Sequence, residues 1–332
     1  MNQLTAKRTK DFMTKYAIYM ILFILILIIT IMRPDFMSYG NLRNILIQSA
    51  TRIIIAMGVG GILITAGTDL SAGRMVGLAA VISSSMLQNP DYARRFFPDQ
   101  PQLQMWMPII VAIGVCTLLG ILNGIVVAVF EVPPFIATLG MMVIVYGICS
   151  LYFDMPPNNS QPIGGLRKDF VDLGTGSFFD PSNGLPYIVV IAILVSIVVY
   201  VLHNNTRLGK NMFAIGGNPQ AARVSGINVG KNLIIIYAFA GAMYGLAGVL
   251  ESARTGGASN NYGNGYELDA IAACVVGGVS TSGGVGTVPG MLAGVLIFTI
   301  INYGLTFIGA NPYTQQIVKG IIIIVAVALD IR

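Results

Sequence analysis

The chain has 332 residues, of which 55% are hydrophobic and 10% are charged, and its formal net charge is +5. Soluble domains carry about a quarter charged residues, so this deficit, with a mean hydropathy of +0.76, excludes an ordinary water-soluble globular protein and indicates a membrane protein. The positive charge requires no nucleic-acid partner, because basic residues at the cytoplasmic ends of membrane helices account for it.

The first predicted element is a membrane helix that is not cleaved off as a signal peptide. Four basic residues lie within residues 1–15, and an apolar run over residues 16–32, about long enough to cross a bilayer, follows them. An Arg-Pro-Asp sequence comes next, in place of the small residues of a signal-peptide cleavage site. We therefore expect residues 1–15 to form a cytoplasmic N-terminal tail.

Nine further apolar segments give a predicted total of ten membrane helices, in one domain over residues 16–330. We expect helices because lipid offers no hydrogen bonds, so each backbone polar group must find its partner within its own element. No segment shows the alternation of polar and apolar residues that a β-barrel strand has. The segment at 268–279 is short for a membrane span, so the alternative count is eight spans with two re-entrant segments. The nine segments cover residues 45–66, 74–88, 106–130, 134–152, 187–202, 232–250, 268–279, 290–308 and 314–329.

Loop charges orient these predicted helices. Starting from a cytoplasmic N-terminus, ten spans place loop 203–231, with four basic residues and no acidic one, in the cytoplasm. Loop 153–186, with four aspartates against one arginine and one lysine, then lies in the periplasm, together with the charge-balanced loop 89–105. This is the positive-inside pattern, and it predicts that both termini are cytoplasmic.

The stretch TAGTDLSAGRMVG interrupts two apolar runs at residues 65–77. Its first glycine loosens the backbone, and Asp69 or Ser71 could cap the next helix by accepting its free amide protons. Two interpretations remain open, a tight turn at the cytoplasmic surface and a helix break that lines a pore. The candidate residues for this break and pathway, which include three isolated polar side chains of other apolar segments, are Thr68, Asp69, Ser71, Asn123, Thr138 and Asn302.

Glycines are frequent inside the apolar segments. Gly241, Gly245 and Gly248 share one face of the segment at 232–250. Small residues on one face let two helix backbones approach closely, so we interpret this stripe as a packing surface in preference to a ligand site.

Two acidic residues, Glu267 and Asp269, are the only charges between Arg254 and Lys319. Intramembrane acids are functional candidates by default, but acids at the start of a helix also stabilise its positive end. We favour capping and helix packing for this pair.

No pattern of catalytic or metal-binding residues is apparent in the sequence. The glycine-rich stretch at 277–290 lacks the Gly-Lys-Ser/Thr of a nucleotide P-loop. The three cysteines, Cys116, Cys149 and Cys274, are far apart in apolar runs, and His203 is the single histidine, whereas a metal site needs clustered ligands. We expect no enzyme activity, no bound metal, no cofactor and no disulfide on this chain.

The stretch IGGNPQAARVSG at residues 215–226 predicts a short helix in the cytoplasmic loop. Asn218 is a preferred N-cap, Pro219 suits the first helical position, and Gly226 can adopt the left-handed conformation that ends a helix. A helix of about two turns is unstable alone in water. We therefore expect it to rest on a cytoplasmic partner, with its small residues entering a groove.

Three stretches together resemble the permease subunits of bacterial ABC sugar importers of the ribose/galactose/xylose type. They are NTRLGKNMFAIGGNPQAARVSGINVGKN, YELDAIAACVVGGVSTSGGVGTVPG and GTDLSAGRMVGLAA. The similarity extends over about residues 16–330 and is stronger to the galactose/methyl-galactoside branch. Ribose-type members tend to have Gly-Ile-Asp-Leu-Ser-Val-Gly-Ser where this chain has Gly-Thr-Asp-Leu-Ser-Ala-Gly-Arg.

The resemblance implies a multi-pass protein of the bacterial inner membrane that pairs with a second copy of itself. A cytoplasmic ATPase with two fused nucleotide-binding halves would hold the ATP and magnesium, and a periplasmic sugar-binding protein would deliver the monosaccharide. Galactose or methyl-galactoside is the expected sugar, and ribose or another monosaccharide is the alternative. The residues implied to form the coupling helix that docks on the ATPase are Asn218, Pro219, Ala221, Ala222, Arg223 and Gly226.

An ion-coupled secondary transporter is the competing class, because it also uses broken helices and buried acids. Asp69, Glu267 and Asp269 would then be its coupling sites. The capped cytoplasmic helix argues against it, since a self-contained transporter does not need one. A passive channel is less consistent still, because no ring of repeated polar residues is present.

Overall fold

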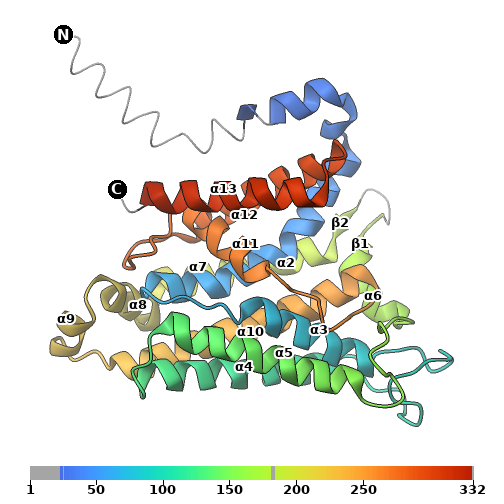
Figure 1. The fold of residues 1–332 in the computed structure, drawn as a ribbon, viewed down its shortest axis with the longest axis horizontal. Coiled ribbons are helices and arrows are strands. Elements are labelled where there is room, and N and C mark those ends of the chain that lie inside the picture. Colours follow the sequence, from blue (N-terminus) through green and yellow to red (C-terminus); the bar gives the residue numbers. More distant parts are fainter. Residues whose placement is uncertain (1–22, 25, 181–183, 331–332) are drawn as a thin grey trace.

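The structure, a computed structural model, describes residues 23–24, 26–180 and 184–330. Helices make up nearly all of it (Figure 1), with one antiparallel hairpin of β1 (Ser177–Phe178) and β2 (Leu185–Pro186). The helices are η1 (Pro34–Met37), α2 (Tyr39–Ile64), α3 (Ala72–Met86), α4 (Trp106–Ala128), α5 (Pro134–Asp154), α6 (Lys168–Thr175), α7 (Tyr187–Asn205), α8 (Arg207–Gly217), α9 (Pro219–Val224), α10 (Val229–Thr255), α11 (Tyr266–Val276), α12 (Val288–Phe307) and α13 (Pro312–Asp330).

The predicted apolar segments from residue 45 onward each coincide with a helix. Of the first segment, residues 23–24 and 26–32 are helical, and the predicted tail at 1–15 lies outside the described residues. Within the described part of the chain, six helices, α2, α4, α5, α7, α10 and α12, are long and apolar enough to cross a membrane. The predicted helical fold of a polytopic membrane protein is therefore supported, with the short hairpin as the exception among the described residues, while the counts of ten and eight spans stay predictions.

Helix α10 packs closely against α4 and α3 along its glycine face. A Cβ atom on Gly241 would lie 2.3 Å from the carbonyl oxygen of Cys116, and one on Gly248 would lie 2.3 Å from that of Val76. Such distances leave no room for any side chain, so the predicted packing role of this stripe is confirmed. Tyr237 and Tyr244 of the same helix are buried beside it, at 1% and 0% exposure.

The long helices run across the view in Figure 1, so their ends gather at two opposite edges. One edge carries α6, the hairpin and the loop at 89–105. Isolated β-bridges join Gln88 to Leu166 and Ile163 to Ala258 there. Helix α6 within loop 153–186 was not predicted, because it is short and polar and has no apolar periodicity long enough to recognise.

Candidate coupling and translocation site

The opposite edge of the molecule carries α8 and α9 (Figure 1). Asn218 is the N-cap of α9, and its Oδ1 accepts hydrogen bonds from the backbone amides of Gln220 and Ala221, both at 3.0 Å. Pro219 occupies the first helical position, where it forfeits no hydrogen bond. The predicted cap is confirmed, and the helix ends at Val224 with Ser225 as its C-cap.

Gly226 ends this helix in the left-handed conformation that the sequence predicts, with φ of +83°. Its amide donates to the carbonyl of Arg223, and the amide of Ile227 donates to the carbonyl of Ala222, both at 3.0 Å. These two bonds form the Schellman motif. The six-residue helix is therefore closed at both ends by its own chain.

Ala222 corrects one expectation about this helix. Its side chain is 4% exposed and packs with Ile215 and Val229 in a small apolar cluster of its own. It therefore lies against this chain and cannot enter a partner's groove. The reason is that a two-turn helix needs an apolar contact to stay folded, and its inward residue supplies it. The outward surface holds Gln220, Ala221 and Val224, of which Val224 is 90% exposed.

Arg223 connects α9 to the turn between α4 and α5. Its guanidinium lies 3.8 Å from a carboxylate oxygen of Glu131, with both side chains largely exposed. A pair of this kind in water contributes about 0–1 kcal/mol. A hollow of about 750 Å³ opens beside it, between this turn, α9 and the first residues of α10.

The three stretches singled out in the sequence meet at the end of α2. The amide of Gly284 donates to the carbonyl of Ile64 at 2.8 Å. A Cβ atom on Gly216, near the end of α8, would lie 1.7 Å from the same oxygen. The loop between α11 and α12, the segment before α9 and the break after α2 are thus in direct contact. This meeting was not predicted, since local patterns contain no information on contacts between distant segments.

The break itself contains a buried polar cluster. Asp69 is 1% exposed, and its Oδ1 accepts hydrogen bonds from the amide of Ser71 at 2.9 Å and from its hydroxyl at 2.6 Å. Asn123 of α4 donates to the Ser71 hydroxyl at 3.0 Å. Ser71 is the N-cap residue of α3, as one of the two predicted alternatives has it, but its side chain makes no cap bond. The expected side-chain cap is therefore wrong, and Asp69 instead closes the turn before the helix by accepting from the amide of Ser71.

Thr138 of α5 secures the same turn from the other side. Its hydroxyl donates to the carbonyl of Thr68 and accepts from the amide of Leu70, both at 3.1 Å. Five of the six candidate pathway residues therefore lie together. The sixth, Asn302 of α12, is elsewhere, and both polar atoms of its side chain are buried without a partner among the described residues. Whether this cluster lines the pathway stays a prediction.

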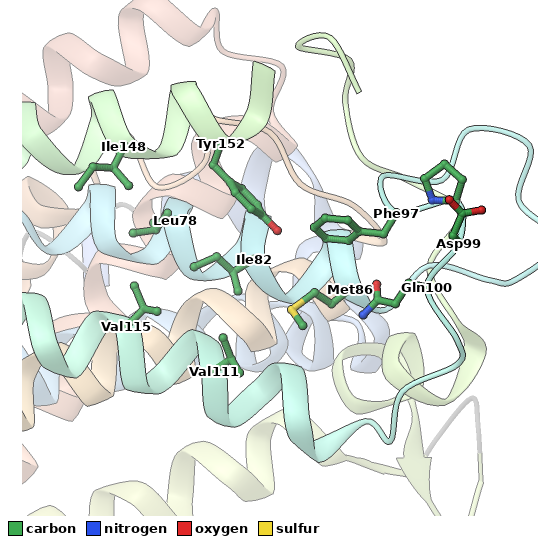
Figure 2. Close-up of a pocket in the computed structure, with 11 residues that line it drawn as sticks. Leu78, Ile82, Met86, Phe97, Asp99, Gln100, Val111, Val115, Ile148 and Tyr152 are labelled. Atoms are coloured by element: carbon green, nitrogen blue, oxygen red, sulfur yellow. The ribbon is translucent and has the colours of Figure 1, made fainter. Parts of the chain in front are cut away.

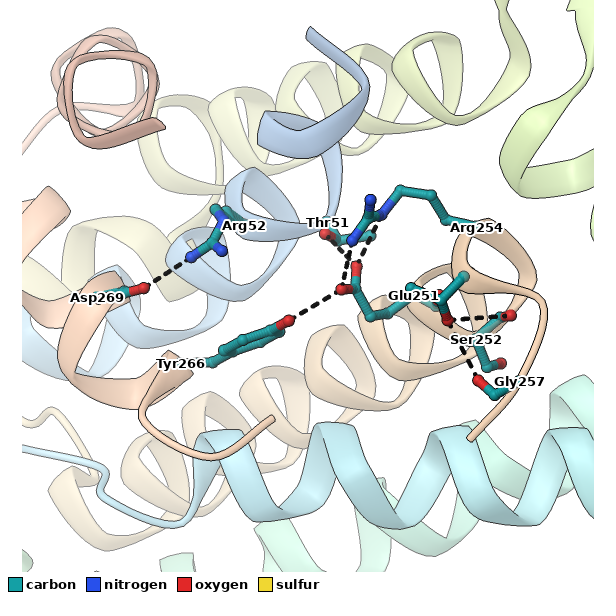
Figure 3. Close-up of polar contacts among 9 residues, drawn as sticks. Thr51, Arg52, Glu251, Ser252, Arg254, Gly257, Tyr266 and Asp269 are labelled. Carbon is teal, nitrogen blue, oxygen red and sulfur yellow. Dashed lines mark hydrogen bonds and ion pairs between the residues drawn. The ribbon is translucent and has the colours of Figure 1, made fainter. Parts of the chain in front are cut away.

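The two acids of α11 differ in their surroundings. Both lie in its first turn, as the sequence predicts, but Gly265, not an acid, is the N-cap. Asp269 pairs with Arg52 of α2 (Figure 3), with 2.7 Å between the carboxylate oxygen and the guanidinium, and Lys319 of α13 lies 3.0 Å from the same oxygen. Asp269 thus joins three helices. One carboxylate oxygen of Glu267, in contrast, is buried without a partner in the described part of the chain.

A second carboxylate, Glu251 of α10, binds three side chains (Figure 3). Arg254 donates to both of its oxygens at 3.2 and 2.7 Å, and the hydroxyls of Thr51 and Tyr266 donate at 2.9 Å each. The sequence reasoning did not name Arg52 or Glu251, and it mentioned Lys319 only as the next charge after Asp269, without assigning it a partner. Their occurrence inside or beside apolar segments was the available signal, because such charges need a partner in the membrane.

A hollow of about 570 Å³ lies between α3, α4, α5 and the loop at 89–105, and Figure 2 shows the side chains that line it. Its lining is mainly aliphatic and aromatic, as in Ile82, Val111 and Phe97, and the loop also contributes Asp99 and Gln100. Such a lining offers few hydrogen-bond partners to a polar ligand. In the described residues, no group of three or more His, Cys, Asp or Glu side chains could hold a metal ion.

Comparison with known proteins gives one family and several long relatives. Residues 41–327 match the family model described as branched-chain amino acid transport system / permease component. The galactose/methyl galactoside import permease proteins MglC of Haemophilus influenzae and Escherichia coli K12 are each 52% identical over 330 residues, covering 99% of this chain and 98% of theirs. The ribose import permease protein RbsC of Escherichia coli K12 is 34% identical, over 97% of this chain and 95% of its own. No solved structure matches.

Proposed function

This chain belongs to the permease family whose model spans residues 41–327, and from that premise we propose that it is the membrane subunit of an ATP-driven importer of galactose or methyl galactoside. The observation that carries this function is 52% identity, over nearly the whole of both chains, to permeases named for that import. The protein is a multi-pass component of the bacterial inner membrane. It makes and breaks no covalent bond and holds no cofactor, and its energy comes from ATP and magnesium on a partner.

The proposed topology has ten spans in a single domain over residues 16–330, with both termini in the cytoplasm. This topology is supported by contacts between loops that it assigns to the same side of the membrane. Ile163 and Ala258 pair at the edge assigned to the periplasm. Ile64 and Gly284, and Glu131 and Arg223, meet at the edge assigned to the cytoplasm.

Three protein partners follow from this function. A second copy of the chain forms the other half of the permease, and a periplasmic sugar-binding protein docks on the face of loops 89–105 and 153–186. A cytoplasmic ATPase with two fused nucleotide-binding halves docks on α9. The exposed residues Gln220, Ala221 and Val224 form the contact surface, which we call the docking face. Asn218 and Gly226 hold that face in a fixed helix.

Movement of the docking face reaches the membrane through a short path. Helix α9 follows α8 after one residue, and Gly216 of α8 contacts the carbonyl of Ile64 at the end of α2. The Asp69 turn begins only a few residues further on. A displacement of α9 by the ATPase therefore acts directly on the break between α2 and α3, and this break is the element that we propose to change between inward-open and outward-open states.

Ribose, or another monosaccharide, is the second candidate substrate, favoured by 34% identity to RbsC over 97% of this chain. The deciding experiment reconstitutes the chain in liposomes with the ATPase and the sugar-binding protein of its own system, and measures uptake of labelled galactose, methyl galactoside and ribose. Galactose uptake that requires all three components supports the proposal. Uptake of ribose alone would favour the second candidate, and uptake by the permease without the ATPase would refute the function.

A further inference from the structure

Arg74 places a positive charge in the middle of the membrane-spanning region. Its guanidinium carbon lies 4.4 Å from the ring centroid of Tyr146, and this tyrosine is close to the centre of α5, which runs from Pro134 to Asp154. The guanidinium also donates to Oδ1 of Asn264 at 2.9 Å. A cation at this depth needs protein partners or water.

Non-helical backbone reaches the same depth. Ala258 pairs with Ile163 at the edge that we assign to the periplasm. From there the chain turns back toward the interior of the molecule. A Cβ atom on Gly73 would lie 2.2 Å from the carbonyl oxygen of Gly263, so this segment touches the first turn of α3. Backbone without helical hydrogen bonds is tolerated at membrane depth only where protein buries it or water lines it.

Part of the surface around Arg74 is exposed to solvent or lipid in the single chain. The side chain of Tyr146 is 41% exposed, and Asn264 is also exposed. Lipid is a poor neighbour for an asparagine and a half-buried arginine, because neither can be hydrogen-bonded by acyl chains. This face must therefore border water or a second polypeptide.

Two polar atoms beneath this face are buried and have no partner among the described residues. One is Nη1 of Arg74, and the other is Oε2 of Glu267, whose residue is only 7% exposed. The carboxylate lies against Gly73, since a Cβ atom there would be 2.0 Å from Oε2. Arg74 follows Gly73 directly, yet the structure records no ion pair between Arg74 and Glu267. A buried donor or acceptor that stays unpaired costs free energy, so each of these two atoms can still take a hydrogen-bonding partner from outside this chain.

The chemistry of this set suits a neutral polyol. A free N–H donor and a free carboxylate acceptor can bind adjacent hydroxyl groups, which both donate and accept. The opposite charges cancel, so the site does not favour an anion or a cation. The aromatic ring of Tyr146 offers an apolar surface to the C–H groups of a sugar ring.

We propose that Arg74, Tyr146, Asn264 and Glu267 form a monosaccharide-binding site within the translocation path, here called the Arg74 site. The sugar in transit accepts a hydrogen bond from Nη1 of Arg74 and donates one to Oε2 of Glu267. The inference rests on the proposed function, and it adds that the permease itself, besides a binding protein, contacts the sugar.

The first test measures uptake and ATP hydrolysis together, in liposomes that contain the permease, its ATPase and its sugar-loaded binding protein. Glu267→Ala and Arg74→Gln should lower labelled galactose uptake at least fivefold per ATP hydrolysed, with stimulated hydrolysis within twofold of wild type. Arg74→Lys should recover part of the loss, because it keeps a donor. Arg33→Gln, the same change at an arginine that lies over Phe307, is the matched control and should behave as wild type.

The second test does not require an active variant. The cysteines of the chain, Cys116, Cys149 and Cys274, are buried, so an introduced cysteine can be labelled selectively. Asn264→Cys should react with a membrane-impermeant thiol reagent, and millimolar galactose should slow the reaction at least fivefold. Leu194→Cys, exposed on α7 at 57%, should stay unlabelled because lipid covers it.

The outcomes separate this inference from the function on which it rests. If wild type imports no monosaccharide, the proposed function fails. If wild type imports galactose while both site variants keep its uptake per ATP, the Arg74 site is refuted. An Asn264→Cys protein that is not labelled, or that galactose does not protect, refutes it as well.

Discussion

The amide of Gly284 donates a hydrogen bond to the carbonyl oxygen of Ile64 at 2.8 Å. This bond satisfies one of the carbonyls that the end of a helix leaves free. It also joins the loop before α12 to the end of α2, beside Gly216 of the segment that leads into α9. The surface that we propose to contact the ATPase lies on α9, and this short helix directly follows the segment that touches the break between α2 and α3.

Gly216 and its neighbour give the sharpest test of this junction. A Cβ atom on Gly216 would lie 1.7 Å from the carbonyl oxygen of Ile64, whereas one on Gly217 would meet nothing within 4 Å. Gly216→Ala should therefore displace α8 from α2 and reduce coupled transport at least tenfold. Gly217→Ala, the matched control, should retain it. The measurement is galactose uptake in liposomes at equal protein, and equal activity of the two variants would contradict the proposed path.

The docking face and the inward side of α9 should respond differently to a charge. Val224→Asp changes a side chain that is 90% exposed, so the permease should insert normally and lose co-purification with the ATPase. Ala222→Arg forces a long side chain into the cluster with Ile215 and Val229. Overpacking typically costs about 1–3 kcal/mol, so α9 should unfold locally.

Limited proteolysis of loop 203–231 distinguishes these two variants. We expect new cleavage in Ala222→Arg and the wild-type pattern in Val224→Asp. A Val224→Asp protein that binds the ATPase as wild type does would remove this surface from the interface.

Asp69 should matter for the folding of the break. Asp69→Leu leaves the amide and hydroxyl of Ser71 without their acceptor in a buried site. Each buried unsatisfied group costs about 1–3 kcal/mol, so the variant should accumulate poorly in the membrane. Asp69→Asn keeps an acceptor oxygen and should accumulate with partial transport activity. The check is the amount of protein in purified membranes, and normal accumulation of Asp69→Leu would show that these bonds are dispensable.

Asp269 should be needed to keep α2, α11 and α13 together. Asp269→Asn leaves Arg52 and Lys319 without their shared carboxylate. Breaking a buried ion pair from one side costs about 3–5 kcal/mol. The ion pairs of Asp269 are only partly buried, so we expect a smaller loss of stability, measured as a lower melting temperature in detergent. Lys319→Gln leaves the Arg52 pair intact and should be milder. Equal melting temperatures for wild type and Asp269→Asn would refute the role.

ATP, and not an ion gradient, should drive uptake. The basis is the family relationship, together with a capped helix at the edge that we assign to the cytoplasm. Galactose uptake should survive collapse of the proton gradient while ATP is maintained, and should stop when ATP is depleted. Uptake that an uncoupler abolishes at normal ATP would instead favour an ion-coupled transporter using Asp69, Glu267 or Asp269.

The sequence by itself determined the properties that depend on neighbouring residues. Apolar runs of sufficient length predicted the membrane helices, the Asn-Pro pair at 218–219 predicted the start of α9, and Gly226 predicted its end. These signals are local because a helix satisfies its own backbone, and its caps use residues within one turn.

Only the tertiary structure decided which distant residues meet, and in which direction a side chain points. Ala222 faces its own chain, because the apolar partners that make it inward, Ile215 and Val229, belong to other segments. Asp269 forms ion pairs with Arg52 and Lys319, which are far from it in the sequence. Helix packing brings these groups together, and in a low-dielectric interior a charge is stable only where such partners happen to lie.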